Sequence, residues 1–281
     1  MSAKPKGKLI IIGGAEEKHR EGQMEILEEV SRHAHKGNGK LVVVTVATQF
    51  PEELAETYTQ VFNGLGISKI DVLDIRTRSD AQLEENVNKV KGASAIFFTG
   101  GDQLRITSQI GDSPVFQCMQ ERYIDGATIA GTSAGAAAMP ETMLVAGPGD
   151  ESNRLWALDM APGLGFIKDA VIDSHFAERG RMGRLLGAVA QNPKNLGLGI
   201  DEDTAVYVQN QDFFEVLGSG AVYVVDGSGI TFSSLSEKNA EGVLSVYDVK
   251  LHVLSRGDCF DLSSRQPTFA VKKEKLEAKE A

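Results

Sequence analysis

The chain has 281 residues, of which 42% are hydrophobic and 24% are charged, and its formal net charge is −10 at pH 7. A chain of this length buries a large core without disulfides or metals, and the composition is that of an ordinary globular protein. The acidic balance argues against general binding to nucleic acid or to an anionic membrane, because both require a basic surface.

Short apolar runs alternate with longer amphipathic stretches in the first half of the chain. The apolar runs predict strands at residues 9–12, 41–46, 70–75, 95–98 and 127–130. The amphipathic stretches predict helices at residues 24–35, 52–65, 81–90, 103–110 and 115–123. Strands that are apolar throughout indicate a parallel sheet covered on both faces. With right-handed crossovers, the expected fold class is α/β, with a doubly wound, mostly parallel sheet flanked by helices.

Beyond residue 200 the pattern changes to short strands separated by glycine turns. These strands are predicted at residues 205–208, 213–216, 221–225 and 246–254, and we expect them to form C-terminal β-hairpins that extend or cap the sheet. We therefore expect a single domain over residues 1–271. The highly charged residues 272–281 are expected to form a frayed tail.

The N-terminus and the cysteine content both favour a cytoplasmic protein. The apolar run 9–12 is too short for the core of a signal peptide. No apolar stretch approaches the roughly 20 residues that span a bilayer. Cys118 and Cys259 are the only cysteines, too few for a disulfide framework or a zinc site.

The sequence Gly131-Thr132-Ser133-Ala134-Gly135 matches the pattern G-x-S-x-G. A predicted strand precedes it, and the alanine-rich residues that follow can open a helix. This is the context of a strained strand-to-helix turn that exposes a nucleophilic serine. The start of a helix also favours negative charge that develops beside that serine. The alternative is a plain glycine turn, and we favour a nucleophile at Ser133.

A serine hydroxyl needs a base, and the sequence has five histidines. Four of them fall at a helix end, in a late strand or in a basic loop: His19, His33, His35 and His252. His175 instead follows the apolar run 170–174, which places it at the carboxyl end of a predicted strand. Catalytic groups of open parallel sheets gather at that edge, so His175 is the predicted base.

The third member should be a carboxylate that orients the imidazole. Residues 199–204 contain three acids, Asp201, Glu202 and Asp203, and their spacing does not choose among them. The chain order of serine, histidine and acid differs from that of the α/β-hydrolases, in which the acid precedes the histidine.

Attack on a carbonyl also needs donors for the oxyanion. The amide that follows the nucleophile, that of Ala134, is the first candidate. Gly100 and Gly101 end a neighbouring predicted strand, where a bare backbone approaches a substrate closely. We take the Gly101 amide as the second donor; the alternative is that these glycines only make a sharp turn.

Three arginines, Arg179, Arg181 and Arg184, follow the candidate base by a few residues. Arginines so placed are suited to clamp carboxylates bidentately. A solvated basic helix start is the alternative, but helix N-termini usually favour acids, so we favour a ligand role.

Five sequence runs together resemble the cyanophycinases, members of the serine peptidase family that also holds the aspartyl dipeptidase called dipeptidase E. The runs are Thr99-Gly100-Gly101-Asp102-Gln103, Gly131-Thr132-Ser133-Ala134-Gly135, Asp173-Ser174-His175-Phe176, Arg179-Gly180-Arg181-Met182-Gly183-Arg184 and Gly199-Ile200-Asp201-Glu202. They recur in order between residues 9 and 208, and they are specific together although each alone is not.

The resemblance implies a fold like that of class I glutamine amidotransferases, with serine where those enzymes carry cysteine. It implies a triad of Ser133, His175 and Glu202 and a homodimer. We expect acyl-enzyme chemistry with no metal or organic cofactor, because the protein itself supplies the nucleophile, the base and the oxyanion donors. The implied substrate is cyanophycin, a polyaspartate with arginine joined to each side-chain carboxylate. Such an enzyme removes β-aspartyl-arginine dipeptides from the C-terminal end of the polymer, and neither nucleic acid nor membrane is expected as a partner.

Six residues are expected to contact that zwitterionic substrate. The three arginines would hold backbone carboxylates, and Gln103 and Asp173 would meet a guanidinium or an amide. Ser174 departs from the family pattern, because a cyanobacterial relative carries glutamine there. This departure puts the substrate contacts around His175 in doubt, but not the triad.

Three other functions are weighed against this one. An aspartyl dipeptidase of the same family would not need three arginine clamps. A glutamine amidotransferase subunit would carry a cysteine nucleophile. A binding module that cradles phosphate on Gly13–Gly14 or Gly100–Gly101 would be expected to show a dinucleotide or P-loop fingerprint, which neither pair provides.

Overall fold

The structure is a computed structural model, and it describes residues 4–19, 24–36, 39–145, 158–236 and 243–268. The predicted tail at residues 272–281 lies outside this part of the chain. No helix among the described residues is long and apolar enough to cross a membrane.

A nine-stranded sheet forms the centre of the molecule, in the order β17-β16-β11-β10-β1-β5-β4-β2-β3. Five neighbouring strands are parallel: β1 (Leu9–Ile12), β5 (Thr128–Thr132), β4 (Ala95–Phe98), β2 (Lys40–Val44) and β3 (Lys69–Leu73). Four antiparallel strands extend the sheet beyond β1: β10 (Thr204–Gln209), β11 (Phe213–Gly218), β16 (Cys259–Asp261) and β17 (Gln266–Thr268). The predicted α/β fold with a mostly parallel sheet and a C-terminal antiparallel extension is confirmed.

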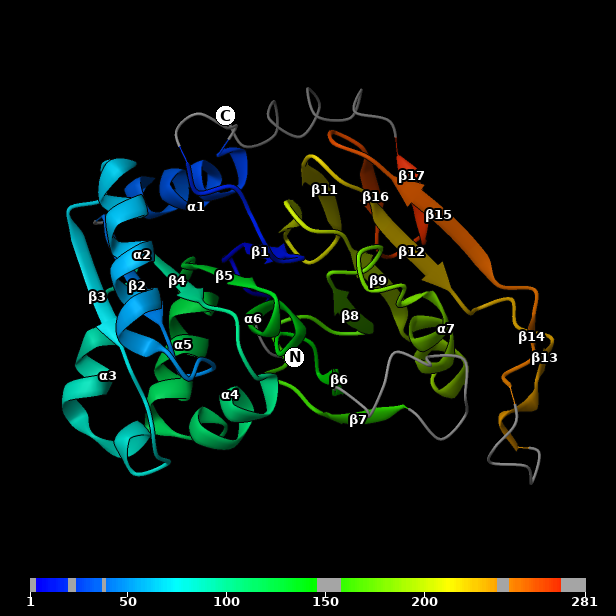
Figure 1. The fold of residues 1–281 in the computed structure, drawn as a ribbon, viewed down its shortest axis with the longest axis horizontal. Coiled ribbons are helices and arrows are strands. Elements are labelled where there is room, and N and C mark those ends of the chain that lie inside the picture. The colour runs from blue at the N-terminus through cyan, green and yellow to red at the C-terminus, as the bar shows by residue number, and fades with distance from the viewer. Residues whose placement is uncertain (1–3, 20–23, 37–38, 146–157, 237–242, 269–281) are drawn as a thin grey trace.

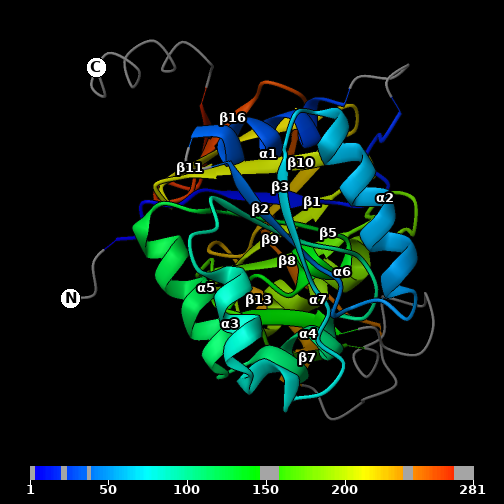
Figure 2. The same cartoon turned by 90° about the vertical axis from the view of Figure 1, so that its left-hand side faces the viewer.

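Helices cover both faces of this sheet (Figure 2). One core joins β1 and β4 to α1 (Glu25–Lys36) and α2 (Pro51–Gly64). The core on the other face includes side chains of α4 (Gln103–Ile110) and α5 (Pro114–Asp125), with Val90 of α3 (Glu84–Val90). Within β1, Ile10 and Ile12 face the first core while Leu9 and Ile11 face the second, so every residue of the strand is buried. This two-sided burial explains why the strand is apolar throughout.

The helix predicted at residues 81–90 is interrupted. A 3-10 helix at Asp80–Gln82 is followed by extended backbone at Leu83, and α3 begins only at Glu84. The buried side chain of Asn86 donates to the carbonyl of Asp80 at 2.9 Å, which ties the two segments across the break. The other predicted helices of the first half lie within two residues of their expected bounds.

A second, four-stranded sheet lies beside the first, in the order β15-β12-β9-β8 (Figure 1). It contains β8 (Ala170–Ser174), β9 (Leu196–Ile200), β12 (Val222–Asp226) and β15 (Lys250–Leu254), and α7 (Met182–Gln191) packs against it. The strand predicted at residues 246–254 is split into β14 (Val246–Tyr247), which pairs with β13 (Phe232–Ser233), and β15. A further pair joins β6 (Thr142–Val145) to β7 (Asp159–Pro162).

The two sheets share one core and meet at their strand ends. Ile172 of β8 and Leu198 of β9 belong to the same buried cluster as Ile129 of β5. At the edge of the core, the His175 amide, just after β8, donates to the carbonyl of Gly13, just after β1, at 2.8 Å. The carboxyl ends of β1, β5, β8 and β9 therefore converge on one place.

Candidate active site

Ser133 occupies a strained turn between β5 and the short helix α6 (Ala134–Ala137). Its backbone has φ 54° and ψ −113°, a conformation that a non-glycine residue adopts only when the surrounding structure enforces it. A Cβ at Gly131 would lie 2.8 Å from the backbone of Gly135, and a Cβ at Gly135 would lie 2.6 Å from the carbonyl oxygen of Phe98. The small residues of the motif are therefore required by close backbone packing, and the serine side chain is left half-exposed.

A chain of two hydrogen bonds joins the predicted triad. Ser133 Oγ lies 2.9 Å from His175 Nε2, and His175 Nδ1 lies 2.6 Å from Glu202 Oε1. Because an ionised carboxylate only accepts hydrogen bonds, Nδ1 carries the proton and Nε2 is left to accept from the serine hydroxyl. This tautomer and order are those of a serine nucleophile with an oriented base.

The two acids beside Glu202 have structural partners instead. Asp201 accepts hydrogen bonds from the amides of Ala177 and Ala221, at 2.9 and 3.2 Å. Asp203 accepts from the amide of Glu17 at 3.0 Å and from the hydroxyl of Ser219 at 2.7 Å. Of these three acids, the one that reaches the imidazole is Glu202.

Gly13 and Gly14, which follow β1, lie against His175 and the end of β9. Gly14 has φ +114°, and a Cβ there would lie 2.5 Å from His175 Nε2 and 2.9 Å from Nδ1. A Cβ on Gly13 would lie 2.5 Å from the carbonyl oxygen of Ile200. From the sequence alone, the pair suggested only a phosphate cradle. Its contact with the histidine could have been anticipated from the position of two glycines at the carboxyl edge of the sheet.

The remaining histidines lie away from Ser133. His19 is exposed, His33 packs on Tyr207 with ring centroids 5.3 Å apart, and His252 packs on Phe260 at 5.6 Å. His35 Nε2 lies 3.4 Å from the carbonyl oxygen of Leu65. The choice of His175 as the histidine at the serine therefore agrees with the geometry.

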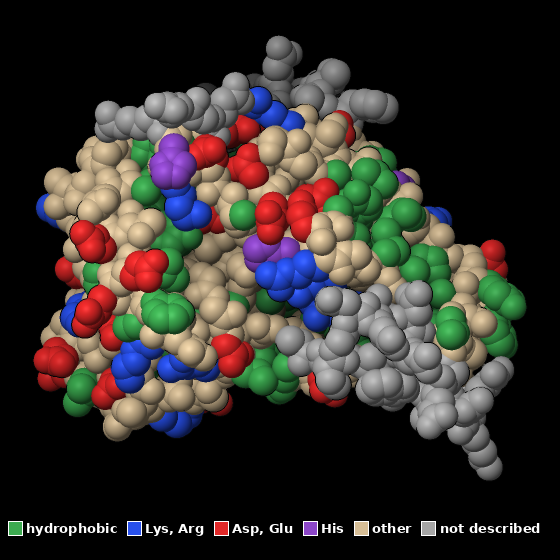
Figure 3. Space-filling model, in the orientation of Figure 1, with side chains coloured by type: hydrophobic (Ala, Val, Ile, Leu, Met, Phe, Trp, Pro, Cys, Tyr) green, Lys and Arg blue, Asp and Glu red, His purple; other side chains and the backbone are tan. Residues whose placement is uncertain are grey.

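Asp173 holds two of the three predicted arginines. Its side chain is fully buried, and its carboxylate accepts from Arg181 at 3.0 Å and from Arg184 Nε at 2.8 Å, with a second bond from the Arg184 fork. Burial lowers the pKa of Arg181, and the adjacent Asp173 carboxylate opposes that shift. One carboxylate balances only one of the two guanidiniums, so the cluster keeps positive charge beside the triad. Figure 3 shows basic and acidic side chains next to a histidine in the middle of this face.

The other predicted contact residues differ in how the fold uses them. Arg179 is exposed. Arg181 also donates to the carbonyl of Ser174 at 2.6 Å, and the Ser174 side chain is buried. Gln103 donates to the carbonyl of Leu144 at 2.9 Å. Asp173 was expected to meet a substrate guanidinium, and the structure gives it internal guanidiniums in place of that ligand.

Of the predicted oxyanion donors, the amide of Ala134 directly follows the serine in the chain, and Gly101 follows a glycine that lies beside the serine. A Cβ at Gly100 would lie 3.4 Å from Ser133 Cβ and 3.9 Å from Oγ, so the bare α-carbon of Gly100 faces the nucleophile. Gly101 has φ +143°, and a Cβ there would lie 2.8 Å from the amide nitrogen of Thr48. The amide of Ala134 is the first of α6, and the first N–H groups of a helix have no partner within it.

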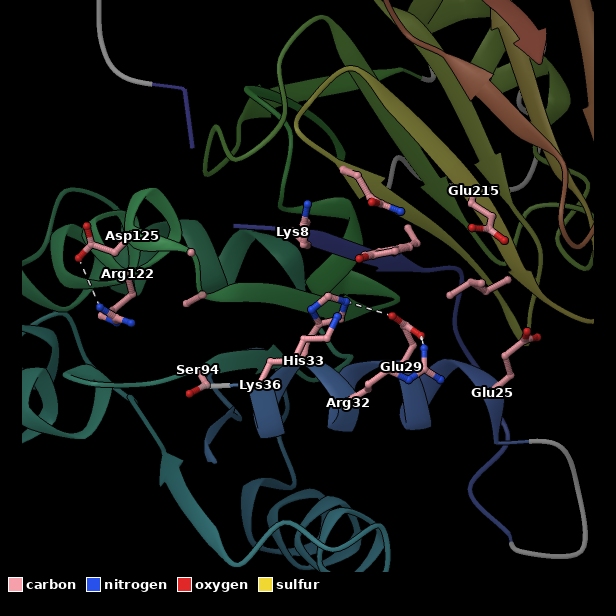
Figure 4. A pocket seen from close by; sticks show the side chains of 15 residues that line it. Lys8, Glu25, Glu29, Arg32, His33, Lys36, Ser94, Arg122, Asp125 and Glu215 are labelled. Atoms are coloured by element: carbon pink, nitrogen blue, oxygen red, sulfur yellow. Dashed lines mark hydrogen bonds and ion pairs between the residues drawn. The ribbon is translucent and has the colours of Figure 1, made fainter. Parts of the chain in front are cut away.

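A separate cavity of about 690 Å³ lies elsewhere on the molecule (Figure 4). Its lining includes Lys8, Ser94 and Ala127, which immediately precede β1, β4 and β5. It therefore lies at the amino edge of the parallel strands, whereas Ser133 follows the carboxyl end of β5. Among the described residues, no group of three or more histidine, cysteine, aspartate or glutamate side chains is arranged to hold a metal ion.

Comparison with known proteins identifies the family. Residues 9–216 match the family model of peptidase family S51. The chain belongs to this family. The cyanophycinase of Geminocystis herdmanii is 36% identical over 92% of this chain and 95% of its own length, and that of Nostoc sp. is 37% identical over 92% and 86%. The chain is thus a hydrolase of the peptidase class, and the predicted resemblance to cyanophycinases is confirmed.

The fold agrees with a solved member of the peptidases. A peptidase from an acI-B1 actinobacterium superposes with a TM-score of 0.69 and covers 93% of this chain and 99% of its own. Its sequence is only 20% identical, so this likeness concerns the fold alone.

Proposed function

We propose that the chain is a serine exopeptidase that hydrolyses cyanophycin to β-aspartyl-arginine dipeptides. The observation that carries the proposal is the pair of hydrogen bonds from Ser133 to His175 and from His175 to Glu202, at 2.9 and 2.6 Å. It occurs in a member of peptidase family S51 whose relatives at 36% and 37% identity are cyanophycinases.

The proposed reaction begins with the attack of Ser133 Oγ on the scissile carbonyl carbon. His175 Nε2 takes the hydroxyl proton, and Glu202 stabilises the imidazolium through Nδ1–H. When the tetrahedral intermediate collapses, the C–N bond breaks and His175 gives its proton to the departing amine. Water then attacks the acyl-enzyme with His175 again as the base, releasing the acid product and restoring the serine.

Backbone amides stabilise the oxyanion in this scheme. The Ala134 amide at the start of α6 and the Gly101 amide are the proposed donors. Gly100, which precedes Gly101, lies beside the nucleophile, since a Cβ there would lie 3.9 Å from Ser133 Oγ.

Recognition of the substrate is assigned to the basic cluster beside the triad. Arg179, Arg181 and Arg184 are proposed to bind carboxylates of the polyaspartate backbone, with Gln103 and Ser174 at the border of the site. Asp173 aligns Arg181 and Arg184 for this task, because both guanidiniums bond to its buried carboxylate. We also propose a homodimer, which the family resemblance implies and which sedimentation of the purified protein tests. The proposed cytoplasmic location rests on the short N-terminal apolar run and the low cysteine content.

Product identification tests the function. Purified protein incubated with insoluble cyanophycin is expected to release β-aspartyl-arginine, and Ser133→Ala is expected to release none while still binding the polymer. Release of no dipeptide from the polymer, together with turnover of free aspartyl dipeptides, would instead make the chain an aspartyl dipeptidase of the same family.

A further inference from the structure

The loop that follows β1 contacts the backbone on both sides of the candidate triad. The carbonyl of Gly13 accepts from the amide of His175, and the carbonyl of Gly14 accepts from the amide of Asp203, both at 2.8 Å. The serine turn is bound to the end of the same strand, because the amide of Ser133 donates to the carbonyl of Ile12 at 3.0 Å. The same loop carries a buried charged side chain, that of Glu16, which has no place in the proposed reaction.

Glu16 is a buried carboxylate with a full set of donors. The residue is 2% exposed, and Oε1 accepts from the hydroxyl of Tyr58 at 2.5 Å and lies 3.1 Å from Lys18 Nζ. Its other oxygen, Oε2, accepts from the hydroxyl of Thr132 at 2.5 Å. A carboxylate that has been removed from water is retained only when such partners compensate its charge.

Thr132 connects this carboxylate to the serine. It is the last residue of β5, is 3% exposed, and immediately precedes Ser133. The backbone at Ser133 is held at φ 54°, so the flanking residues must resist relaxation of the turn. A charge-assisted bond from a buried carboxylate to the preceding side chain supplies that resistance, because such bonds are shorter and stronger than neutral ones.

We infer that Glu16 is a positioning residue for the proposed reaction: through Thr132 it holds Ser133 Oγ within reach of His175 Nε2. The inference rests on the proposed function and adds to it. Glu16 reaches the nucleophile only through Thr132, so removal of that hydroxyl should reproduce the loss of the carboxylate. The loop after β1 thus contacts the proposed base through Gly14 and positions the proposed nucleophile through Glu16.

Four single variants separate this role from general stabilisation. Glu16→Gln removes the charge of the carboxylate. Thr132→Val removes the hydroxyl and keeps the shape of the side chain, and Thr132→Ser keeps the hydroxyl. Tyr58→Phe removes a donor from Oε1 of Glu16 and leaves the bond to Thr132 intact, so it serves as the control for loosening of the carboxylate. For each variant, kcat and KM are measured on solubilised cyanophycin, and Tm is measured by calorimetry.

Thr132→Val is expected to lose about 10- to 100-fold in kcat with KM changed less than about threefold, because misplacement of a reacting group mainly costs turnover. Thr132→Ser should recover most of the activity. Tyr58→Phe should lower Tm and keep kcat within about threefold of wild type. The double variant Glu16→Gln with Thr132→Val should lose little more kcat than the more impaired single variant, because both break one link.

Two results would overturn the inference: a folded Thr132→Val with wild-type kcat, or a loss of kcat in Tyr58→Phe equal to that in Thr132→Val. Failure of the proposed substrate is distinguishable, since the wild type would then release no dipeptide. In that case the variants are compared by the rate at which a serine-directed phosphonate labels Ser133. The labelling rates are expected to rank the variants in the same order as the kcat values given above.

Discussion

Gly14 lies against the imidazole of His175 so closely that a Cβ at Gly14 would come within 2.5 Å of Nε2. Bare backbone therefore lies against the part of the ring that carries both nitrogens, the atoms that bond Ser133 and Glu202. This contact makes the glycine a requirement of the site as well as of the turn.

Gly14→Ala is expected to displace the His175 ring and to lower kcat by about 100-fold or more, because a shift of about 1 Å in a reacting group costs that much. Gly257→Ala is the matched control: Gly257 also has a positive φ, of +84°, but a Cβ there meets nothing within 4 Å. Both variants place alanine at a positive φ, and only Gly14→Ala adds the clash with the ring, so a loss of kcat confined to Gly14→Ala in a folded protein confirms the role. Equal kcat values in the two variants would contradict it.

Glu202→Gln is expected to lower kcat by about 10³- to 10⁴-fold with the fold intact, because an amide at this position no longer fixes the Nδ1–H tautomer of His175. Asp201→Asn is the control, since Asp201 bonds to the amides of Ala177 and Ala221 and not to the imidazole. It should lower Tm and leave kcat within about tenfold of wild type. Full activity in Glu202→Gln would remove this residue from the triad.

Asp173→Asn is expected to destabilise the protein by about 3–5 kcal/mol, because it leaves the guanidiniums of Arg181 and Arg184 without their buried counter-charge. The KM for cyanophycin should rise more than kcat falls. The exposed pair of Asp169 and Lys194 gives the control, with side chains 51% and 72% exposed. Asp169→Asn should change stability by less than about 1 kcal/mol in urea unfolding. A similar small change in Asp173→Asn would show that the arginines hold their positions without it.

His33 should make the fold sensitive to acid. Burial, together with the positive charges of Lys36, Lys8 and Arg32, lowers the pKa of His33 to about 4, although Glu29 Oε1 lies 3.0 Å from Nε2 (Figure 4). Between pH 4 and 6.5 the unfolded chain therefore binds a proton that the folded chain does not, so this contribution to stability is complete above pH 6.5 and is lost as the pH falls towards 4.

The loss amounts to about 3 kcal/mol at most for a shift of this size. Urea unfolding of wild type and His33→Gln at pH 7 and at pH 4.5 measures it. The fall in unfolding free energy between the two pH values should be smaller in His33→Gln. An identical fall in both proteins would show that other groups cause the acid sensitivity.

The sequence predicted local elements well where a single effect, such as burial or the steric demand of a tight turn, decides them. The bounds of β1 and β4 match the apolar runs because both strands are buried on both faces. Ser133 was recognisable because its turn constrains five adjacent residues. The assignment of residues 170–174 to a sheet was not decidable in the same way, since a buried parallel strand has the same apolar pattern in either sheet.

Long-range pairing was not predictable from spacing. Asp201, Glu202 and Asp203 are adjacent in the chain, and only their partners in space distinguish them: backbone amides, an imidazole and a hydroxyl. The internal pairing of Asp173 with Arg181 and Arg184 was missed for the same reason. These arginines follow Asp173 by only eight and eleven residues, but the path of the connection between β8 and α7 decides whether they reach it.

The candidate triad is divided between the two sheets, because Ser133 follows β5 of the large sheet while His175 and Glu202 follow β8 and β9 of the small one. The 2.9 Å hydrogen bond between Ser133 and His175 therefore depends on how the two sheets are aligned. Core residues such as Ile129, Ile172 and Leu198 take no part in the proposed reaction, yet they pack together between the sheets and so set that alignment. Repacking between the sheets is therefore a route by which turnover changes in this fold without any change in the residues that bind or react.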